Sequence, residues 1–266
     1  MKQFLIPFLV WVLASTNIYA QDAYATHAAQ QPTMEDIFSV KETFKYEVKY
    51  GFLKLGWVEV ELLSDTLHDG VLKKHMVTEI KSNSRIPLVG TELDLFHSLF
   101  YVNDDGVPVS SYYWKDNTDE KKYKEIIYDF DREKGVVRYK EEDDTRDTLD
   151  LVEPATSGQE IFYFSRLHAG SGKKSRLPVY VTKKLGYINM ENSSNIEMRN
   201  YAPFDDEVET YLSKGSTENI DGPFGFSGDF RAWFLADDLR VPLEARVKVL
   251  FGNAIVRLIE YDREEL

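Results

Sequence analysis

The stretch FKYEVKYGFLKLGWVEVELL, residues 44–63, decides the fold that this sequence predicts. Apolar residues from Phe44 to Tyr50 alternate with charged residues, which is typical of a β-strand with one buried face. A second alternating run places Val58 and Val60 opposite Trp57. The two runs predict neighbouring strands of an antiparallel sheet.

The same alternation recurs along most of the chain, so we expect a mainly β protein. The expected architecture is a single large curved antiparallel sheet, a half-open barrel or clam-like shape, with one packed α-helix. That helix follows Pro154, where Ser157 and Glu160 have the spacing of a capping box and Gly170 provides a stop. A sheet of this length must close, split or be covered, because its edges would otherwise pair with other chains.

The N-terminal residues are typical of a secretory signal peptide. Lys2 precedes an apolar run that is too short to span a bilayer, and Ala20 offers a cleavage point. We therefore expect a signal peptide over residues 1–20, a flexible leader over 21–40 and a single mainly β domain over 41–266. The expected product is exported, soluble and periplasmic, with no stable membrane span after cleavage.

Composition excludes several classes of site. The chain has no cysteine, which rules out disulfides, thiolate metal sites and a lipid-modified cysteine. With 32 basic and 45 acidic residues, its net charge is −13. An acidic chain without a concentrated basic stripe is poorly suited to nucleic acid or anionic lipid headgroups. We expect no metal and no cofactor, since the five histidines lack the spacing of a metal pair.

Aromatic residues on the alternating strands and on the helix are the candidate ligand-binding residues. They have two interpretations: an aromatic core for a large sheet, or the lining of an apolar cavity on its concave face. The sequence leaves both open. The candidates are Tyr46, Tyr50, Trp57, Tyr112, Trp114, Phe164 and Trp233.

Asp237 and Asp238 form the best candidate for carboxylate chemistry, because they adjoin each other between two apolar runs. Adjacent residues on a turn rarely face each other across a cleft, as a glycosidase requires, even with Glu244 nearby. We interpret them as the tight connection between two strands, with Arg240 pairing at the surface. The loop HAGSGKKS, residues 168–175, lacks the first glycine of a phosphate-binding loop, and no G-x-S-x-G elbow is present. No catalytic residues are predicted, and the protein is expected not to be an enzyme.

Two segments resemble a known family. The segment YEVKYGFLKLGWVEVEL, residues 46–62, looks like the opening hairpin of the bacterial exported proteins called domain of unknown function 3108. The segment AWFLADDLRVPLEARVKVLFGNAIVRLIEY, residues 232–261, looks like that family's end, and the resemblance extends from Phe44 to Tyr261. It implies no reaction and no catalytic residues. By fold analogy, curved sheets with a packed helix are similar to periplasmic carriers that shield acyl chains in a half-open barrel.

These observations favour a cell-envelope protein that binds an apolar or amphipathic, lipid-like ligand on its curved sheet. The alternative is a structural or scaffolding module that binds an envelope protein partner through a sheet edge. A glycan hydrolase is a remote alternative.

Overall fold

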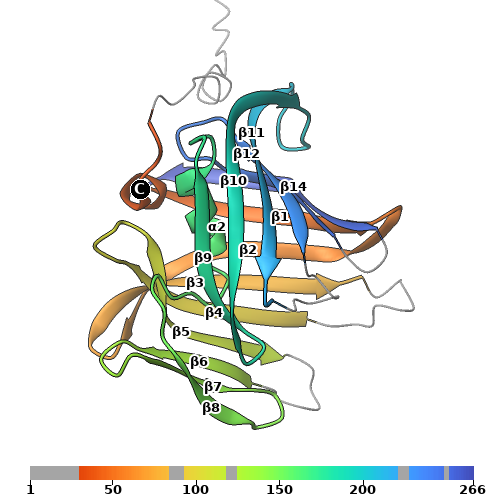
Figure 1. The fold of residues 1–266 in the computed structure, drawn as a ribbon. Coiled ribbons are helices and arrows are strands. Elements are labelled where there is room, and N and C mark those ends of the chain that lie inside the picture. The colour runs from red at the N-terminus through yellow and green to blue at the C-terminus, as the bar shows by residue number, and fades with distance from the viewer. Residues whose placement is uncertain (1–29, 84–92, 118–124, 221–227, 249–251) are drawn as a thin grey trace, which may run out of the picture.

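The computed structural model describes residues 30–83, 93–117, 125–220, 228–248 and 252–266 (Figure 1). One antiparallel sheet contains fourteen strands in the order β8-β7-β6-β5-β4-β3-β2-β1-β14-β13-β12-β11-β10-β9. The predicted fold class, a single curved antiparallel sheet with a packed helix, is confirmed. The elements are α1 (Met34–Phe38), β1 (Val40–Tyr50), β2 (Leu53–His68), β3 (Val71–Ser82), β4 (Leu93–Val102), β5 (Pro108–Asn117), β6 (Glu125–Asp131), β7 (Val136–Lys140), β8 (Arg146–Asp150), α2 (Ile161–His168), β9 (Lys174–Val181), β10 (Lys184–Arg199), β11 (Val208–Glu218), β12 (Asp229–Leu235), β13 (Pro242–Lys248) and β14 (Asn253–Glu265).

The sheet curls until its two outermost parts meet, and tyrosine side chains and one isolated backbone bridge, between Thr156 and Val179, join them in place of a strand ladder. The hydroxyl of Tyr180 on β9 donates to the carbonyl of Asp150 at 2.6 Å and accepts the amide of Val152 at 2.8 Å. The Tyr128 hydroxyl on β6 accepts the amide of Lys183 at 3.0 Å. Aromatic rings pack beneath these bonds. The result is a half-open barrel whose closure depends on tyrosine side chains.

Helix α2 lies within the curve of the sheet (Figure 1), and its N-terminal end is attached to β3 and β4. The buried Glu160 carboxylate accepts the hydroxyls of Ser98 on β4 and of Ser157, and Thr78 on β3 donates to Gln159 at 3.1 Å. Only half of the predicted capping box forms. The Glu160 side chain accepts the Ser157 amide, but no side chain caps the helix in return.

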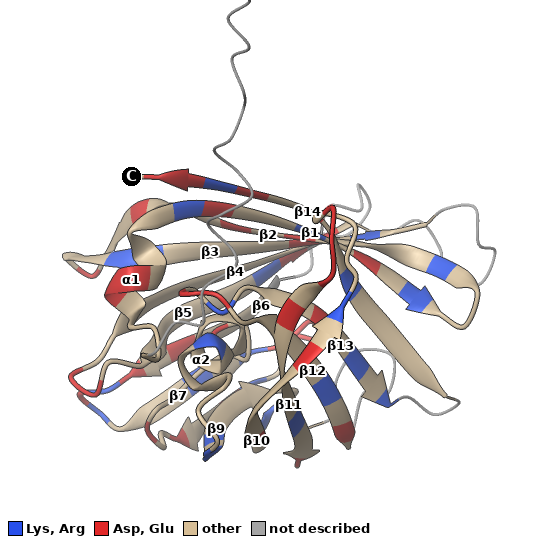
Figure 2. Ribbon diagram, turned by 90° about the horizontal axis from the view of Figure 1, so that it is seen from above, with Lys and Arg blue, Asp and Glu red and all other residues tan. Residues whose placement is uncertain are grey.

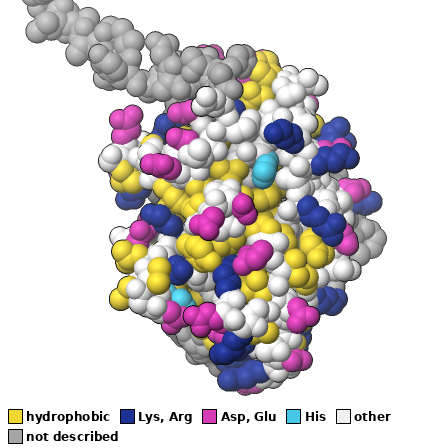
Figure 3. All heavy atoms as spheres, turned by 60° about the vertical axis from the view of Figure 1, so that its left-hand side comes forward, with side chains coloured by type: hydrophobic (Ala, Val, Ile, Leu, Met, Phe, Trp, Pro, Cys, Tyr) yellow, Lys and Arg dark blue, Asp and Glu magenta, His cyan; other side chains and the backbone are white. Residues whose placement is uncertain are grey.

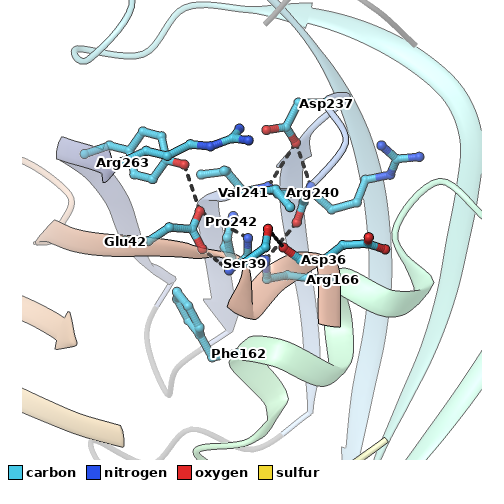
Figure 4. A network of polar contacts seen from close by, with 12 residues as sticks. Asp36, Ser39, Glu42, Phe162, Arg166, Asp237, Arg240, Val241, Pro242 and Arg263 are labelled. Carbon is cyan, nitrogen blue, oxygen red and sulfur yellow. Dashed lines mark hydrogen bonds and ion pairs between the residues drawn. The ribbon is translucent and has the colours of Figure 1, made fainter. Parts of the chain in front are cut away.

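The other end of α2 is held by a buried ion pair (Figure 4). The Arg166 guanidinium is fully buried and binds both Glu42 carboxylate oxygens, at 2.7 and 3.2 Å. Its Nε donates to the Leu239 carbonyl at 2.8 Å, and the Tyr261 hydroxyl donates to Glu42 at 2.7 Å. Arg166 thereby joins α2 to β1 and to the corner between β12 and β13, and Glu42 extends the network to β14 through Tyr261.

The predicted flexible leader is wrong in its last part. Thr33 caps helix α1 in a complete capping box with Asp36, and Met34 and Ile37 are buried in the largest core cluster. Strand β1 then begins at Val40, inside the range assigned to the leader. The sequence prediction overlooked Met34 and Ile37 because polar residues surround them, although their spacing of three places them on one helix face. Residues 1–29, which include the predicted signal peptide, lie outside the described residues.

The core consists of three clusters of buried residues on the concave side of the sheet. The largest contains Phe44, Tyr46 and Val60 from the first hairpin, as the alternation predicts. Hydrophobic side chains also gather near the centre of the face shown in Figure 3, among acidic and basic ones. Among the described residues, no helix has the length and hydrophobicity to cross a membrane.

Replacing Arg166 by Met should lower the free energy of unfolding by about 3–5 kcal/mol, because Glu42 would be left buried without its counter-charge. Adding Glu42→Leu to that variant should recover part of the loss, since an apolar pair needs no counter-charge. Urea unfolding followed by circular dichroism measures both changes.

The matched control is Lys174→Met, which breaks an exposed ion pair with Glu191 and should leave the unfolding midpoint near that of the wild type. A control as unstable as Arg166→Met would contradict the role assigned to the buried pair.

Candidate functional site

A pocket of about 290 Å³ lies between α2 and the concave face of the sheet. Its volume is at the lower end of the roughly 300–1,000 Å³ that small-molecule sites occupy. Two structural features create it: the helix holds the strands apart, and small residues face the gap. The lining residues are Tyr46, Val58, Val60, Ile161, Phe162, Ser165, Ile188, Met190, Thr217, Phe230, Ala232, Trp233, Phe234, Pro242, Glu244, Ala245, Val247 and Val256.

Ala232 on β12 and Ala245 on β13 are cross-strand partners, so two of the smallest side chains stand side by side in the wall. A larger residue at either position would fill the space between sheet and helix. Gly215 on β11 leaves room for the ring of Phe230, which lines the pocket, because an added Cβ would lie 2.2 Å from that ring. The wall is therefore hollowed by a few small residues within an otherwise aromatic and aliphatic surface.

The polar groups of the pocket are few and already bonded. The Tyr46 hydroxyl donates to the Pro242 carbonyl at 2.9 Å, and burial raises the pKa of this phenol well above its ordinary value. Glu244 points to the outer face, where its carboxylate binds three arginines. The pocket thus offers contact with apolar groups and no charged group as a partner.

Of the seven aromatic residues that the sequence singled out, the structure brings Tyr46 into the pocket with its ring. Trp233 contributes to the wall, but its indole points to the outer face, donates to Glu197 at 2.9 Å and stacks under Arg199 at 4.2 Å. Phe164 is buried on another side of α2, in a cluster with residues of β9 and β10. Periodicity assigned these residues to faces without showing where the helix would lie.

The other four candidates lie away from the pocket. Trp57 precedes the lining residue Val58, so its side chain lies on the other face of β2. There the Nζ atom of Lys54 lies 4.5 Å from the centre of the Trp57 ring. Tyr50 follows a register shift after Val48 and packs near Gly252. The remaining two, Tyr112 and Trp114, contact one another and the imidazoles of three histidines on the outer face of β2–β5.

Two of these histidines form a pair. Nε2 of His75 lies 3.1 Å from Nδ1 of His97, and the His97 ring stacks on Trp114 with centroids 4.4 Å apart. Burial lowers the pKa of both imidazoles, so the pair is favoured in its neutral form. In the described part of the chain, no group of three histidine or carboxylate side chains could hold a metal ion.

The Asp237–Asp238 corner is a turn, as expected, but its arginine is not at the surface. Asp237 is buried, and its Oδ1 accepts the amides of Arg240 and Val241 at 2.6 and 3.4 Å. The Arg240 side chain is also buried and donates to the Ala169 carbonyl at 3.2 Å, so the predicted surface pairing is wrong. Arg263 contacts Asp238 instead, at 3.4 Å. The positive φ of Arg240, 55°, turns its side chain inward after the corner.

Strand β14 begins directly after Gly252. Asn253 is already the first residue of β14, where it pairs with Lys248. Gly252 itself has a positive φ of 90°, which glycine adopts without strain.

Phe162, Ala232 and Ala245 line the pocket, and sequence reasoning did not select them. The signal for Phe162 was its position four residues before Arg166, which places both on one helix face. Glu42 was also missed, although it stands in phase with the inward residues Val40 and Phe44. A charge in an inward position of a strand indicates a buried partner.

Burial raises the pKa of Asp237 to about 6; Arg166 opposes this shift and Asp238 adds to it. A raised native pKa means that the folded state loses stability as the pH rises from the ordinary value of 3.8 through 6. The variant Asp237→Asn should therefore gain roughly 1–3 kcal/mol relative to the wild type between pH 4 and pH 7.

Urea unfolding at several pH values measures this difference, with Asp238→Asn as the control for the loss of one negative charge. A difference between Asp237→Asn and the wild type that stays constant over the range would contradict the assignment.

Three comparisons place the chain among known proteins. Residues 45–259 match the family described as "Protein of unknown function (DUF3108)". A solved structure, described as the crystal structure of a beta-barrel-like protein of domain of unknown function DUF1849 from Brucella abortus, is similar with a TM-score of 0.49 and 10% sequence identity. The similarity covers 86% of this chain and 99% of that chain. No curated protein matches the sequence.

Proposed function

The chain belongs to the DUF3108 family of proteins of unknown function, and we propose that it is an exported, non-enzymatic protein that binds an apolar or amphipathic ligand between α2 and its curved sheet. The observation that carries this proposal is the pocket of about 290 Å³ with an almost wholly apolar lining. Binding of an apolar chain or ring there would be favoured by roughly 25 cal/mol for each Å² of apolar surface that is removed from water.

The way α2 is fixed supports a preformed site. Glu160 and Arg166 attach the helix at both ends, so the space beneath it does not depend on the ligand for its shape. A preformed pocket needs less ordering on binding and leaves more of the contact free energy for affinity. The ligand class follows from the lining: hydrocarbon or aromatic, with any charged headgroup outside the pocket.

Export is proposed from the N-terminal sequence. The short apolar run behind Lys2 and the cleavage point after Ala20 are typical of a secretory signal. The absence of cysteine is compatible with an oxidising compartment, where free thiols would be exposed to oxidation.

A scaffolding role through the sheet edges has less support. The edge strand β8 has five residues, RDTLD, three of which are charged, and charged edges discourage pairing with another strand. On the opposite edge, Thr156 already bridges Val179 of β9. One edge is thus short and charged and the other is partly covered, which makes both less suited to a partner strand.

Carboxylate catalysis has less support still. Asp237 is held by the amides of its own turn, and the buried Glu244 is bound by Arg199, Arg246 and Arg257. A general acid and base must both reach a substrate. Carboxylates engaged in this way are oriented toward the protein.

Ala232→Phe should weaken binding of the apolar fluorescent probe N-phenylnaphthylamine at least about tenfold, because the added ring would occupy the pocket. The control is Glu59→Phe, which adds the same ring at an outward position of β2. Fluorescence titration of both variants measures the affinities. Equal weakening in the two variants, or no probe binding by the wild type, would count against the proposal.

Mature protein isolated from its own host should begin at Gln21, because a signal peptidase would cleave after Ala20. N-terminal sequencing and intact mass measure this directly, and cell fractionation shows the compartment. A chain that retains Met1 in the cytoplasmic fraction would contradict export.

A further inference from the structure

A row of basic side chains crosses the outer face of strands β11, β12 and β13. Lys214 is the cross-strand partner of Arg231, and Arg231 is the cross-strand partner of Arg246. Lys248 lies two residues beyond Arg246 and therefore on the same face. Figure 2 shows all lysines and arginines of the described residues as blue bands on the ribbon, spread over the strands of the sheet. The chain as a whole carries a net charge of −13, so this row of positive charges is opposite in sign to the protein's net charge.

The row is unfavourable for the sheet itself. Like charges placed directly opposite one another on neighbouring strands destabilise the pairing, and here three stand in line. Lys214, Arg231 and Lys248 are exposed. Lys214 is the cross-strand partner of Glu191 on β10, and Lys174 and, to a smaller extent, the charge of Lys214 lower the pKa of that carboxyl. Within the described ranges, Arg231 and Lys248 form no ion pair with a carboxylate. Stability alone does not account for this arrangement.

Arg246 is held in place by the structure beneath it. Its Nε donates to the buried Glu244 carboxylate at 2.6 Å, and its guanidinium lies 5.2 Å from the centre of the Trp233 ring. Glu244 also binds Arg199 and Arg257, which keeps it fixed. In the part of the chain that the structure describes, the two terminal nitrogens of Arg246 make no hydrogen bond and remain as donors.

The row borders a hollow of about 460 Å³ that the four basic residues line together with Gly215, Asp229, Phe230 and Asn253. A second hollow of about 540 Å³ adjoins it at Lys214 and is lined also by Glu191, Lys174 and Arg176. Lys174 pairs with Glu191 and Arg176 with Glu218, so among the described residues of the two hollows the positive charge without an ion pair belongs to the row. Neighbouring strands lie about 4.8 Å apart, so the three cations in line extend over roughly 10 Å. That spacing suits a ligand with more than one anionic group. Asp229 at the margin of the hollow would repel an anion, so the ligand would contact the four basic residues.

We propose that the row Lys214, Arg231, Arg246 and Lys248 binds a phosphate-bearing anion, either an anionic phospholipid headgroup or a soluble phosphate compound. Guanidinium groups present paired donors to phosphate oxygens, and lysines add point charge. Composition predicted no basic stripe, because these residues are spread over 35 positions of the sequence and meet only in the sheet. The side chains of the row lie on the opposite face of the strands from the apolar pocket, and among the described residues Phe230 alone lines both hollows.

The test uses the full mature chain with two probes. Inositol hexakisphosphate in a calorimetric titration represents a soluble phosphate compound, and cosedimentation with vesicles of phosphatidylglycerol in phosphatidylcholine represents a headgroup. Arg231→Glu should weaken whichever binding the wild type shows at least about tenfold. Lys134→Glu makes the same charge change at an exposed turn position and should stay within about twofold of the wild type.

The arms separate the outcomes. Binding of the soluble probe alone assigns a soluble phosphate compound, binding of the vesicles alone assigns a headgroup, and both together assign phosphate recognition in either setting. Lack of binding in both arms overturns the proposal, and so does equal weakening by the two variants, which would indicate diffuse charge.

Lys214→Glu is the second variant if Arg231→Glu does not fold. N-phenylnaphthylamine should bind Arg231→Glu as it binds the wild type, so failure of the phosphate site and failure of the apolar pocket are seen separately.

Discussion

The buried ion pair between Glu42 and Arg166 sets the position of helix α2, and the interior of the protein is built around that helix. Removing a carboxylate and a guanidinium from water has a cost of several kcal/mol for each, and that cost is offset only when every donor and acceptor is paired. Arg166 meets this condition through both oxygens of Glu42 and the carbonyl of Leu239. The need to satisfy the pair fixes where α2 lies relative to β1, β14 and the β12–β13 corner.

The position of α2 determines the interior of the barrel. A sheet of fourteen strands that curls on itself would collapse onto its own side chains if nothing stood between its two halves. The helix stands there, attached to Ser98 at one end and to Glu42 at the other. The apolar pocket is the space that remains where Ala232 and Ala245 face it. Binding capacity in this protein is thus a consequence of how the helix is anchored.

The two faces of β11–β13 have different chemistry because side chains alternate along each strand. Inward positions such as Phe230 and Ala232 provide the pocket wall, while Arg231 between them joins the outer basic row. Glu244 connects the two faces in an indirect way. Its buried carboxylate binds Arg246 and Arg257 on the outer face. The next residue, Ala245, lines the pocket on the inner face, where its small side chain leaves space. One short segment of three strands therefore carries both candidate sites.

The amino-acid sequence was enough to predict the sheet, the main helix and the turn at Asp237, because alternation and capping are local properties of neighbouring residues. It placed Tyr46 on the inner face for the same reason. It did not determine which aromatic residues would surround a cavity, that α1 would pack into the core, or that Arg240 would turn inward. It also did not show that Glu42 would meet Arg166 or that Lys214 would align with Arg246. Those outcomes depend on contacts between residues far apart in the chain. Such residues come together only through the register of the fourteen strands and the position of helix α2.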